Sequence, residues 1–142
     1  MKNIKKQTGF TLVELMLVVI VISILVAMVV PRLMGRSDQA RESAAHADIE
    51  ANLASALDLY EVDTGAFPKT EEGLDALITK PSNPKIAKKW KGPYIKKKSA
   101  DPWGNPYVYK FPGSHGTVYD LYSYGKDESE GGGDDITNWE KE

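Results

Sequence analysis

The 142-residue chain contains no cysteine. It can therefore form no disulfide, and it has no thiol nucleophile. A small exported domain often needs disulfides to supplement a thin hydrophobic core. A domain of this kind without cysteine must be stabilised by something else, such as a metal ion or its neighbours in an assembly.

Features typical of enzymes are also scarce. The sequence shows no Ser/His/Asp signature and no phosphate-binding loop, and its only histidines are His46 and His115. His46 falls in a predicted helix and His115 in a Pro-Gly-Ser-His-Gly turn, so we interpret both as structural. We predict that the protein is not an enzyme, has no catalytic residues and cannot hydrolyse a nucleotide.

The net charge of −2 gives no overall nucleic-acid signature. The charges are nevertheless unevenly placed. One stretch is rich in lysine: Lys80, Lys85, Lys88, Lys89, Lys91, Lys96, Lys97 and Lys98. The C-terminal part is rich in acids: Asp127, Glu128, Glu130, Asp134, Asp135, Glu140 and Glu142. Few aromatic residues interleave the lysines, so we interpret them as a solvated surface and expect no nucleic-acid partner.

The N-terminus combines a basic segment with a long apolar run. Residues 1–9 hold three lysines and no acid, and residues 10–30 are apolar except for Thr11, Glu14 and Ser23. As a helix, this run would reach roughly 30 Å, enough to cross a bilayer core. It is too long for a secretory signal peptide and has no small-x-small site after it. We predict a membrane helix with a cytoplasmic N-terminus and the following domain outside.

Glu14 is the anomaly in this run. A carboxylate inside a membrane helix costs about 2.5–3.5 kcal/mol on insertion scales. One interpretation is an acid that snorkels to the interface. The other is a charge that needs a partner within the membrane.

The sequence Lys-Lys-Gln-Thr-Gly-Phe-Thr-Leu-Val-Glu at residues 5–14 resembles the type IV prepilin leader. That resemblance implies that a prepilin peptidase removes residues 1–9 by cutting between Gly9 and Phe10, and that Phe10 becomes N-methylphenylalanine. Glu14 would then pair with the N-terminal amine of a neighbouring subunit during assembly. Such a pair would compensate a charge that is otherwise buried alone.

Residues 31–65 are predicted to continue as the part of a long helix outside the membrane. At Pro31 the helix either ends or continues with a kink or a locally melted stretch; resemblance to pilin filaments favours the second. Apolar residues then recur at helical spacing, and Gly65 is a plausible stop. The apolar residues at this spacing are Ile49, Leu53, Ala56, Leu57 and Tyr60. The alanines indicate either helix propensity or close helix packing in a filament.

Residues 66–142 are predicted to form the globular part of an α+β, pilin-like fold. We expect a short helix over 70–77 with Thr70 as N-cap, a loop over 81–94, and a hairpin formed by 107–111 and 117–123. A three- or four-stranded antiparallel sheet would pack on the long helix. The tyrosines and tryptophans could form a sugar or nucleic-acid platform, but we favour a core role.

Several segments resemble the major pseudopilin family of the type II secretion system (general secretion pathway protein G). They are residues 60–77, 92–94, 101–107, 112–116 and 135–139. The resemblance implies a structural subunit that polymerises into a periplasmic pseudopilus and drives secretion of folded proteins across the outer membrane. The implied partners are further copies of the chain, prepilin peptidase, minor pseudopilins, an inner-membrane assembly platform and an outer-membrane secretin. The alternatives are a type IV pilus subunit for adhesion or DNA uptake, or a membrane-tethered domain that never polymerises.

The segment 124–136 is acidic and rich in glycine. Composition alone favours a flexible, solvated loop. The family resemblance instead implies calcium bound in place of a disulfide. Asp127 and Asp135 would supply carboxylates, with Asp134 as an alternative, and Tyr124 and Ser129 would supply main-chain carbonyls.

Overall fold

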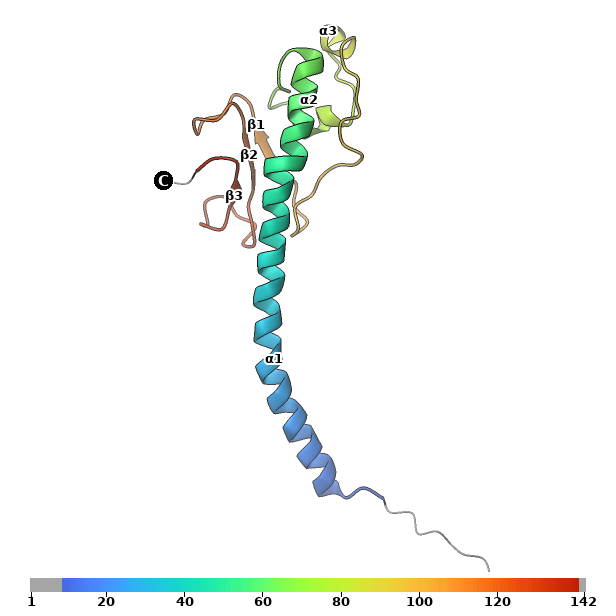
Figure 1. The fold of residues 1–142 in the computed structure, drawn as a ribbon, viewed down its shortest axis with the longest axis vertical. Coiled ribbons are helices and arrows are strands. Elements are labelled where there is room, and N and C mark those ends of the chain that lie inside the picture. Colours follow the sequence, from blue (N-terminus) through green and yellow to red (C-terminus); the bar gives the residue numbers. More distant parts are fainter. Residues whose placement is uncertain (1–8, 141–142) are drawn as a thin grey trace, which may run out of the picture. The chain divides into compact units, whose positions relative to one another are not determined.

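The computed structural model describes residues 9–140, apart from the side chains of residues 30–34. The chain divides into two compact units, Met1–Ser37 and Asp38–Glu142. Helix α1 (Leu12–Ala47) supplies the described helix of the first unit and the beginning of the second (Figure 1).

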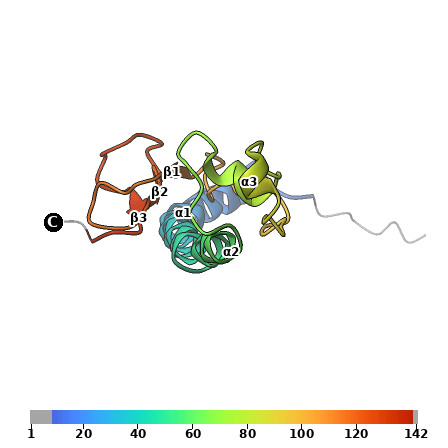
Figure 2. The ribbon, with the colours of Figure 1, turned by 90° about the horizontal axis from the view of Figure 1, so that it is seen from above.

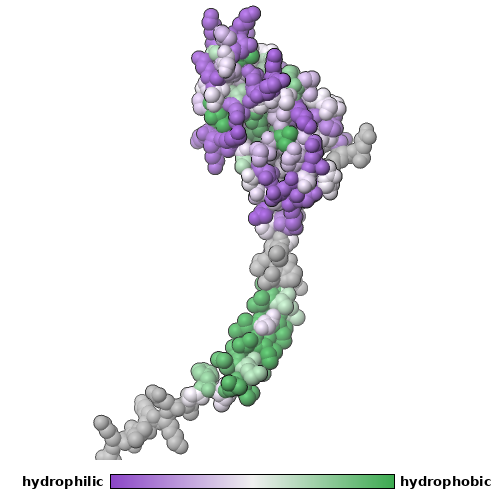
Figure 3. All heavy atoms as spheres, turned by 180° about the vertical axis from the view of Figure 1, so that it is seen from behind, coloured by the Kyte–Doolittle hydropathy of each residue, from purple (hydrophilic) through white to green (hydrophobic). Residues whose placement is uncertain are grey.

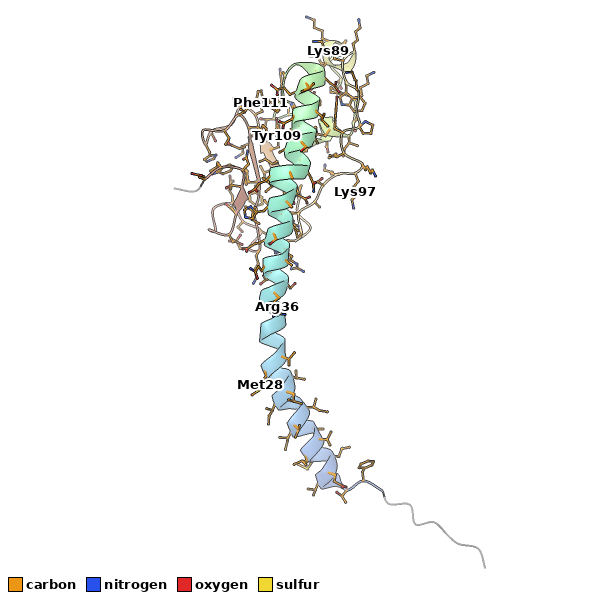
Figure 4. All side chains as sticks on the ribbon, in the orientation of Figure 1. Met28, Arg36, Lys89, Lys97, Tyr109 and Phe111 are labelled. Carbon is orange, nitrogen blue, oxygen red and sulfur yellow. The ribbon has the colours of Figure 1, made fainter. Side chains whose placement is uncertain are left out.

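In the first unit, α1 begins with a long apolar stretch that only Glu14 and Ser23 interrupt. The stretch Leu12–Val29 has a mean hydropathy of 3.1, none of it is buried, and it is long and apolar enough to cross a membrane. Figure 3 shows it as a predominantly apolar surface, and Figure 4 shows Met28 projecting from the helix. Helical backbone continues through Pro31 and Gly35. The interpretation in which the helix ends at Pro31 is therefore wrong, whereas a kink or a loosening on assembly stays a prediction.

In the second unit, the helical backbone continues as a π-helical segment, η1 (Asp48–Leu53), and then as α2 (Ala54–Thr64). The buried residues Ala45, Ile49 and Leu53 are spaced by four. The wider π-helical turn keeps such a spacing on one face. The helix ends at Gly65, which has a φ of 91° and donates from its N–H to the Glu61 carbonyl at 2.7 Å.

Two short helices follow, and both differ from expectation. The segment η2 (Gly73–Leu77) is a 3₁₀ helix, and Thr70 does not cap it. Thr70 Oγ1 instead accepts from Phe111 N at 2.9 Å and donates to Phe111 O at 3.0 Å. The expected loop over 81–94 contains α3 (Pro84–Ala87), which Asn83 caps by accepting from Lys85 N.

The sheet has three antiparallel strands among the described residues, in the order β1-β2-β3. They are β1 (Val108–Lys110), β2 (Asp120–Ser123) and β3 (Ile136–Thr137). The sheet and α3 flank α2 (Figures 1 and 2). The predicted hairpin and the α+β class are confirmed.

The core lies between α2, η2 and the sheet. Leu57, Leu77 and Leu121 are fully buried. Tyrosines fill much of the remaining space, as Tyr60 meets Tyr94 edge to face with ring centroids 5.7 Å apart. Burial raises the pKa of Tyr60 to about 12. The predicted stripe over 49–60 is confirmed. The core role of the aromatics is confirmed for most of them, because Tyr107, Tyr109 and Tyr122 are buried and Tyr94, Trp103 and Tyr119 pack against the core, but Tyr124 and Trp139 lie outside it.

Candidate assembly and metal-binding sites

The predicted cleavage point lies in exposed, non-helical backbone immediately before α1. Gly9 and Phe10 are both exposed, and 92% of Phe10 is accessible. Residues 1–8 of the predicted leader lie outside the described residues. Cleavage at Gly9 and methylation of Phe10 stay predictions.

Glu14 has a local partner that the sequence reasoning missed. Its Oε2 accepts from Thr11 N and Thr11 Oγ1, both at 2.9 Å, and Glu14 N donates to Thr11 Oγ1 at 3.2 Å. This reciprocal pair is a capping box at the start of α1. The Thr-x-x-Glu spacing would have signalled it. Pairing of Glu14 with a neighbour's amine stays a prediction.

The loop 124–135 is organised by Asp134. Asp134 Oδ2 accepts from Lys126 N at 2.7 Å and from Asp127 N at 2.9 Å. The hydrogen bond from Asp127 N–H contributes most to lowering the pKa of Asp134. Gly125 is buried with a φ of 69°, and a Cβ there would collide with the Asp134 carbonyl. The loop therefore closes tightly on itself.

Two carboxylates meet beside Gly132. A Cβ at Gly132 would strike Asp127 Oδ2 and approach Asp134 Oδ1, so both oxygens lie at one point of the loop. The other Asp127 oxygen, Oδ1, accepts from Ser129 N at 2.9 Å, and Ser129 Oγ donates to the Asp127 carbonyl. Glycine at position 132 leaves space that any side chain would fill.

Asp135 and Tyr124 have other surroundings. Asp135 Oδ2 accepts from Gly131 N at 2.8 Å, whereas its buried Oδ1 has no hydrogen-bond partner. The half-buried Tyr124 meets the Tyr122 ring edge to face, with centroids 5.8 Å apart. Within residues 9–140, no three acidic or histidine side chains form a group that could hold a metal ion. Main-chain oxygens would therefore have to complete any site here.

A Ser/His/Asp cluster is present, although the sequence showed no such signature. Asp120 is fully buried, and its Oδ2 accepts from Ser114 N and Ser114 Oγ and lies 3.0 Å from His115 Nδ1. Burial raises the pKa of Asp120, but hydrogen bonds from Ser114, His115 and Thr117 outweigh it and lower the pKa to about 2. His115 stacks on Trp139 with centroids 4.0 Å apart. Since one carboxylate holds both neighbours, the cluster ties the 112–116 turn to β2.

The lysine-rich stretch forms exposed surface with few internal ion pairs. Lys91 pairs with Asp63 at 2.8 Å and Lys98 with Asp75 at 3.0 Å. Lys89 and Lys97 project outward (Figure 4). This agrees with the interpretation as a solvated face.

Comparison with known proteins gives the same result in sequence and in structure. Residues 32–139 match the family described as type II secretion system protein G, and residues 4–30 match the prokaryotic N-terminal methylation motif. The chain is 50% identical to the type II secretion system core protein G of Pseudomonas aeruginosa, covering 96% of this chain and 97% of that protein. It is 48% identical to the core protein G of Vibrio cholerae, covering 98% and 96%.

The fold is also similar to a solved structure. The crystal structure of the major pseudopilin from the type 2 secretion system of enterohaemorrhagic Escherichia coli superposes with a TM-score of 0.66 at 37% identity. The match covers 75% of this chain and 89% of that one. The chain therefore belongs to the type II secretion system protein G family.

Proposed function

We propose that this chain is the structural subunit that polymerises into a periplasmic pseudopilus and drives secretion of folded proteins across the outer membrane. The supporting observation is that an entirely exposed apolar helix continues into a domain that has its own core. Such a helix is stable only in lipid or in a bundle of apolar helices. A subunit that first resides in the membrane and then polymerises meets these two environments, lipid and a helix bundle, one after the other.

Before assembly, the subunit would cross the inner membrane once, with its N-terminus in the cytoplasm and its globular domain in the periplasm. The lysines before the span favour this orientation. Prepilin peptidase would cut between Gly9 and Phe10 and methylate Phe10. The family's methylation motif over residues 4–30 supports this step.

Cleavage would place a positive amine at the membrane edge, where Glu14 of a neighbouring copy can bind it. Both Thr11 contacts use Glu14 Oε2, so they leave Oε1 for a second partner. Pairing would offset the cost of carrying a lone carboxylate through an apolar bundle. Thr11 would meanwhile hold the carboxylate at the helix start.

Growth requires other components. An inner-membrane assembly platform and a cytoplasmic ATPase would add subunits, minor pseudopilins would form the tip, and an outer-membrane secretin would be the exit pore. The match to protein G over residues 32–139 favours secretion over a type IV pilus for adhesion or DNA uptake. A secretin gene beside genes for exported hydrolases would favour secretion, whereas a retraction ATPase gene beside this one would favour the pilus.

The assembly proposal is tested with Glu14→Ala in a secreting host. We expect the variant to be cleaved and membrane-inserted but to form no fibres in electron micrographs of sheared cells. Glu42→Ala is the matched control, because Glu42 is an exposed acid further along α1. Normal fibres from Glu14→Ala would contradict the proposal.

We further propose that the loop 124–135 binds calcium. Calcium takes six to eight oxygen ligands, including carboxylates and main-chain carbonyls. The oxygens of Asp127 and Asp134 beside Gly132 suit a hard cation, as does the unpartnered Oδ1 of Asp135. Carbonyls of Tyr124 and Ser129 would complete part of the shell. The bound ion would neutralise the clustered acids and cross-link a chain that has no disulfide.

The calcium site is tested by thermal unfolding in calcium chloride and in EGTA. Calcium at about 100 times its Kd would stabilise the wild type by roughly 2.7 kcal/mol. We expect the double variants Asp127→Ala/Asp134→Ala and Asp127→Ala/Asp135→Ala to lose this response. Glu140→Ala, outside the loop, should keep it. A calcium response that survives in both double variants would remove the site from this loop.

A further inference from the structure

One side chain of the C-terminal loop reaches back to α1. Lys126 Nζ lies 2.6 Å from Asp38 Oδ2, although 88 positions separate the two residues. The Asp38 carboxylate is about one-third exposed, at 36%. The hydrogen bond to Asp38 is the main reason that the pKa of Lys126 is raised. Neither the family resemblance nor the sequence pattern pointed to this pair.

The loop itself fixes where Lys126 can reach. The N–H groups of Lys126 and Asp127 both donate to Asp134 Oδ2, and the preceding Gly125 packs directly against the Asp134 carbonyl. If the loop opens, the backbone of Lys126 is no longer held at this position. The ion pair therefore depends on the order of the loop.

Asp38 occupies a particular place on the helix, because it is the first residue of the second unit. The next ties along the helix are Ala45, which is fully buried, and Asp48, whose Oδ2 accepts from Tyr107 Oη at 3.0 Å. Ala45 follows Asp38 by seven positions, or about 10 Å along the helix at 1.5 Å per residue. Losing the Lys126 contact would leave the helix segment from Asp38 to Ala45 without the ion pair that holds its N-terminal end to the loop.

The sequence just before Asp38 is poorly suited to a stable helix. Pro31 has no N–H to donate to the preceding turn, and Gly35 costs about 1 kcal/mol relative to alanine in a helix interior. Opening that begins here can spread along the helix until it meets a tertiary contact. Among the helix residues whose side chains the structure describes, Asp38 is the first with such a contact.

We propose that the Lys126–Asp38 ion pair is a clamp through which the loop 124–135 sets the N-terminal limit of the ordered helix in the globular unit. With the clamp closed, the limit is Asp38; with it open, the limit moves to Ala45. The link to calcium rests on the proposed calcium site, because an ion held by Asp127 and Asp134 would keep Lys126 in place. The clamp itself follows from the contacts alone.

Hydrogen–deuterium exchange of the full chain in detergent micelles tests the clamp. We expect Lys126→Met and Asp38→Asn to speed exchange of a peptide covering residues 36–44 by about two- to five-fold, the range given by a surface ion pair. Lys126→Arg keeps the charge and should keep wild-type exchange. Lys98→Met, which breaks the comparable Lys98–Asp75 pair, should leave residues 36–44 unchanged.

Unchanged exchange of residues 36–44 in Lys126→Met, or an equal change in Lys98→Met, would overturn the clamp. Removing calcium with EGTA tests whether the calcium site is coupled to the clamp. In the wild type it should speed exchange in both 124–135 and 36–44, and in Lys126→Met the response of 36–44 should disappear. A response confined to 124–135 in the wild type would overturn the coupling. No response in either segment would refute the calcium site, while the variants would still decide the clamp.

Discussion

The two ends of one helical stretch use apolar residues in opposite ways. From Leu12 to Val29 apolar side chains cover every side of the helix, apart from Glu14 and Ser23, and none is buried. Between Ile49 and Tyr60 the buried apolar residues form one stripe in the core with η2 and the sheet, whereas Leu59 on another face is exposed. The pattern of apolar residues therefore decides whether a helix is covered by its own chain or by lipid or other subunits.

The same side-chain deletion should therefore have different effects in the two regions. Leu57 is fully buried, whereas 62% of Leu17 is exposed. Leu57→Ala should lower the free energy of unfolding of the globular unit by about 2–5 kcal/mol, because it leaves a cavity. Leu17→Ala should leave that free energy unchanged. Thermal unfolding in micelles, followed by near-UV circular dichroism, measures the free energy of unfolding of both variants. Equal shifts in the two variants would contradict the expected difference between the regions.

The acids of the two regions also differ in their surroundings. Glu14 is exposed at the helix start, whereas Asp120 is buried and its pKa is lowered to about 2. A group whose pKa is lower in the folded state stabilises the protein above its unfolded pKa of about 3.9. That contribution, about 2 kcal/mol, should be lost as the pH falls from about 4 to about 2.

The measurement for this prediction is acid unfolding of the wild type and Asp120→Asn. The variant should be less stable at neutral pH and should show a flatter stability profile between pH 4 and pH 2. Asp58→Asn, at an exposed position of α2, is the control. A steep wild-type profile that persists in Asp120→Asn would place its origin elsewhere.

The smallest effects should have opposite signs. Gly65 ends α2 with a φ of 91°, so Gly65→Ala should destabilise the globular unit by about 1 kcal/mol. That corresponds to a Tm lower by about 4–8 °C. Gly35 lies inside α1 with open space around its Cα, so Gly35→Ala should stabilise the helix by about 0.5–1 kcal/mol. Slower amide exchange around residue 35 would show this, and faster exchange would contradict it.

The parts of the fold that sequence predicted are those that depend on local pattern. The helical spacing of Ile49, Leu53 and Leu57 specifies a buried face, and all three are buried. Thr70 was expected to cap the next helix, but its hydroxyl bonds to Phe111, 41 positions away. Threonine offers the same hydroxyl to either partner, so local sequence could not decide between them.

In the candidate site, too, the sequence predicted the local features but not the contacts that depend on the folded loop. The acidic, glycine-rich composition placed Asp127, Asp134 and Asp135 in one loop. Which of their oxygens meet depends on the tight closure around Gly125 and Gly132, which composition does not encode. The Thr11–Glu14 capping box could have been predicted from the sequence, because its spacing is a local signal.

Assembly from the membrane depends most on the fate of the N-terminal segment, and intact-mass spectrometry of protein purified from a host with an active prepilin peptidase measures that fate directly. We expect a single chain that begins at N-methylated Phe10 and is recovered from membranes or fibres. A mature protein that keeps residues 1–9, or that begins elsewhere with an unmodified amine, would contradict it.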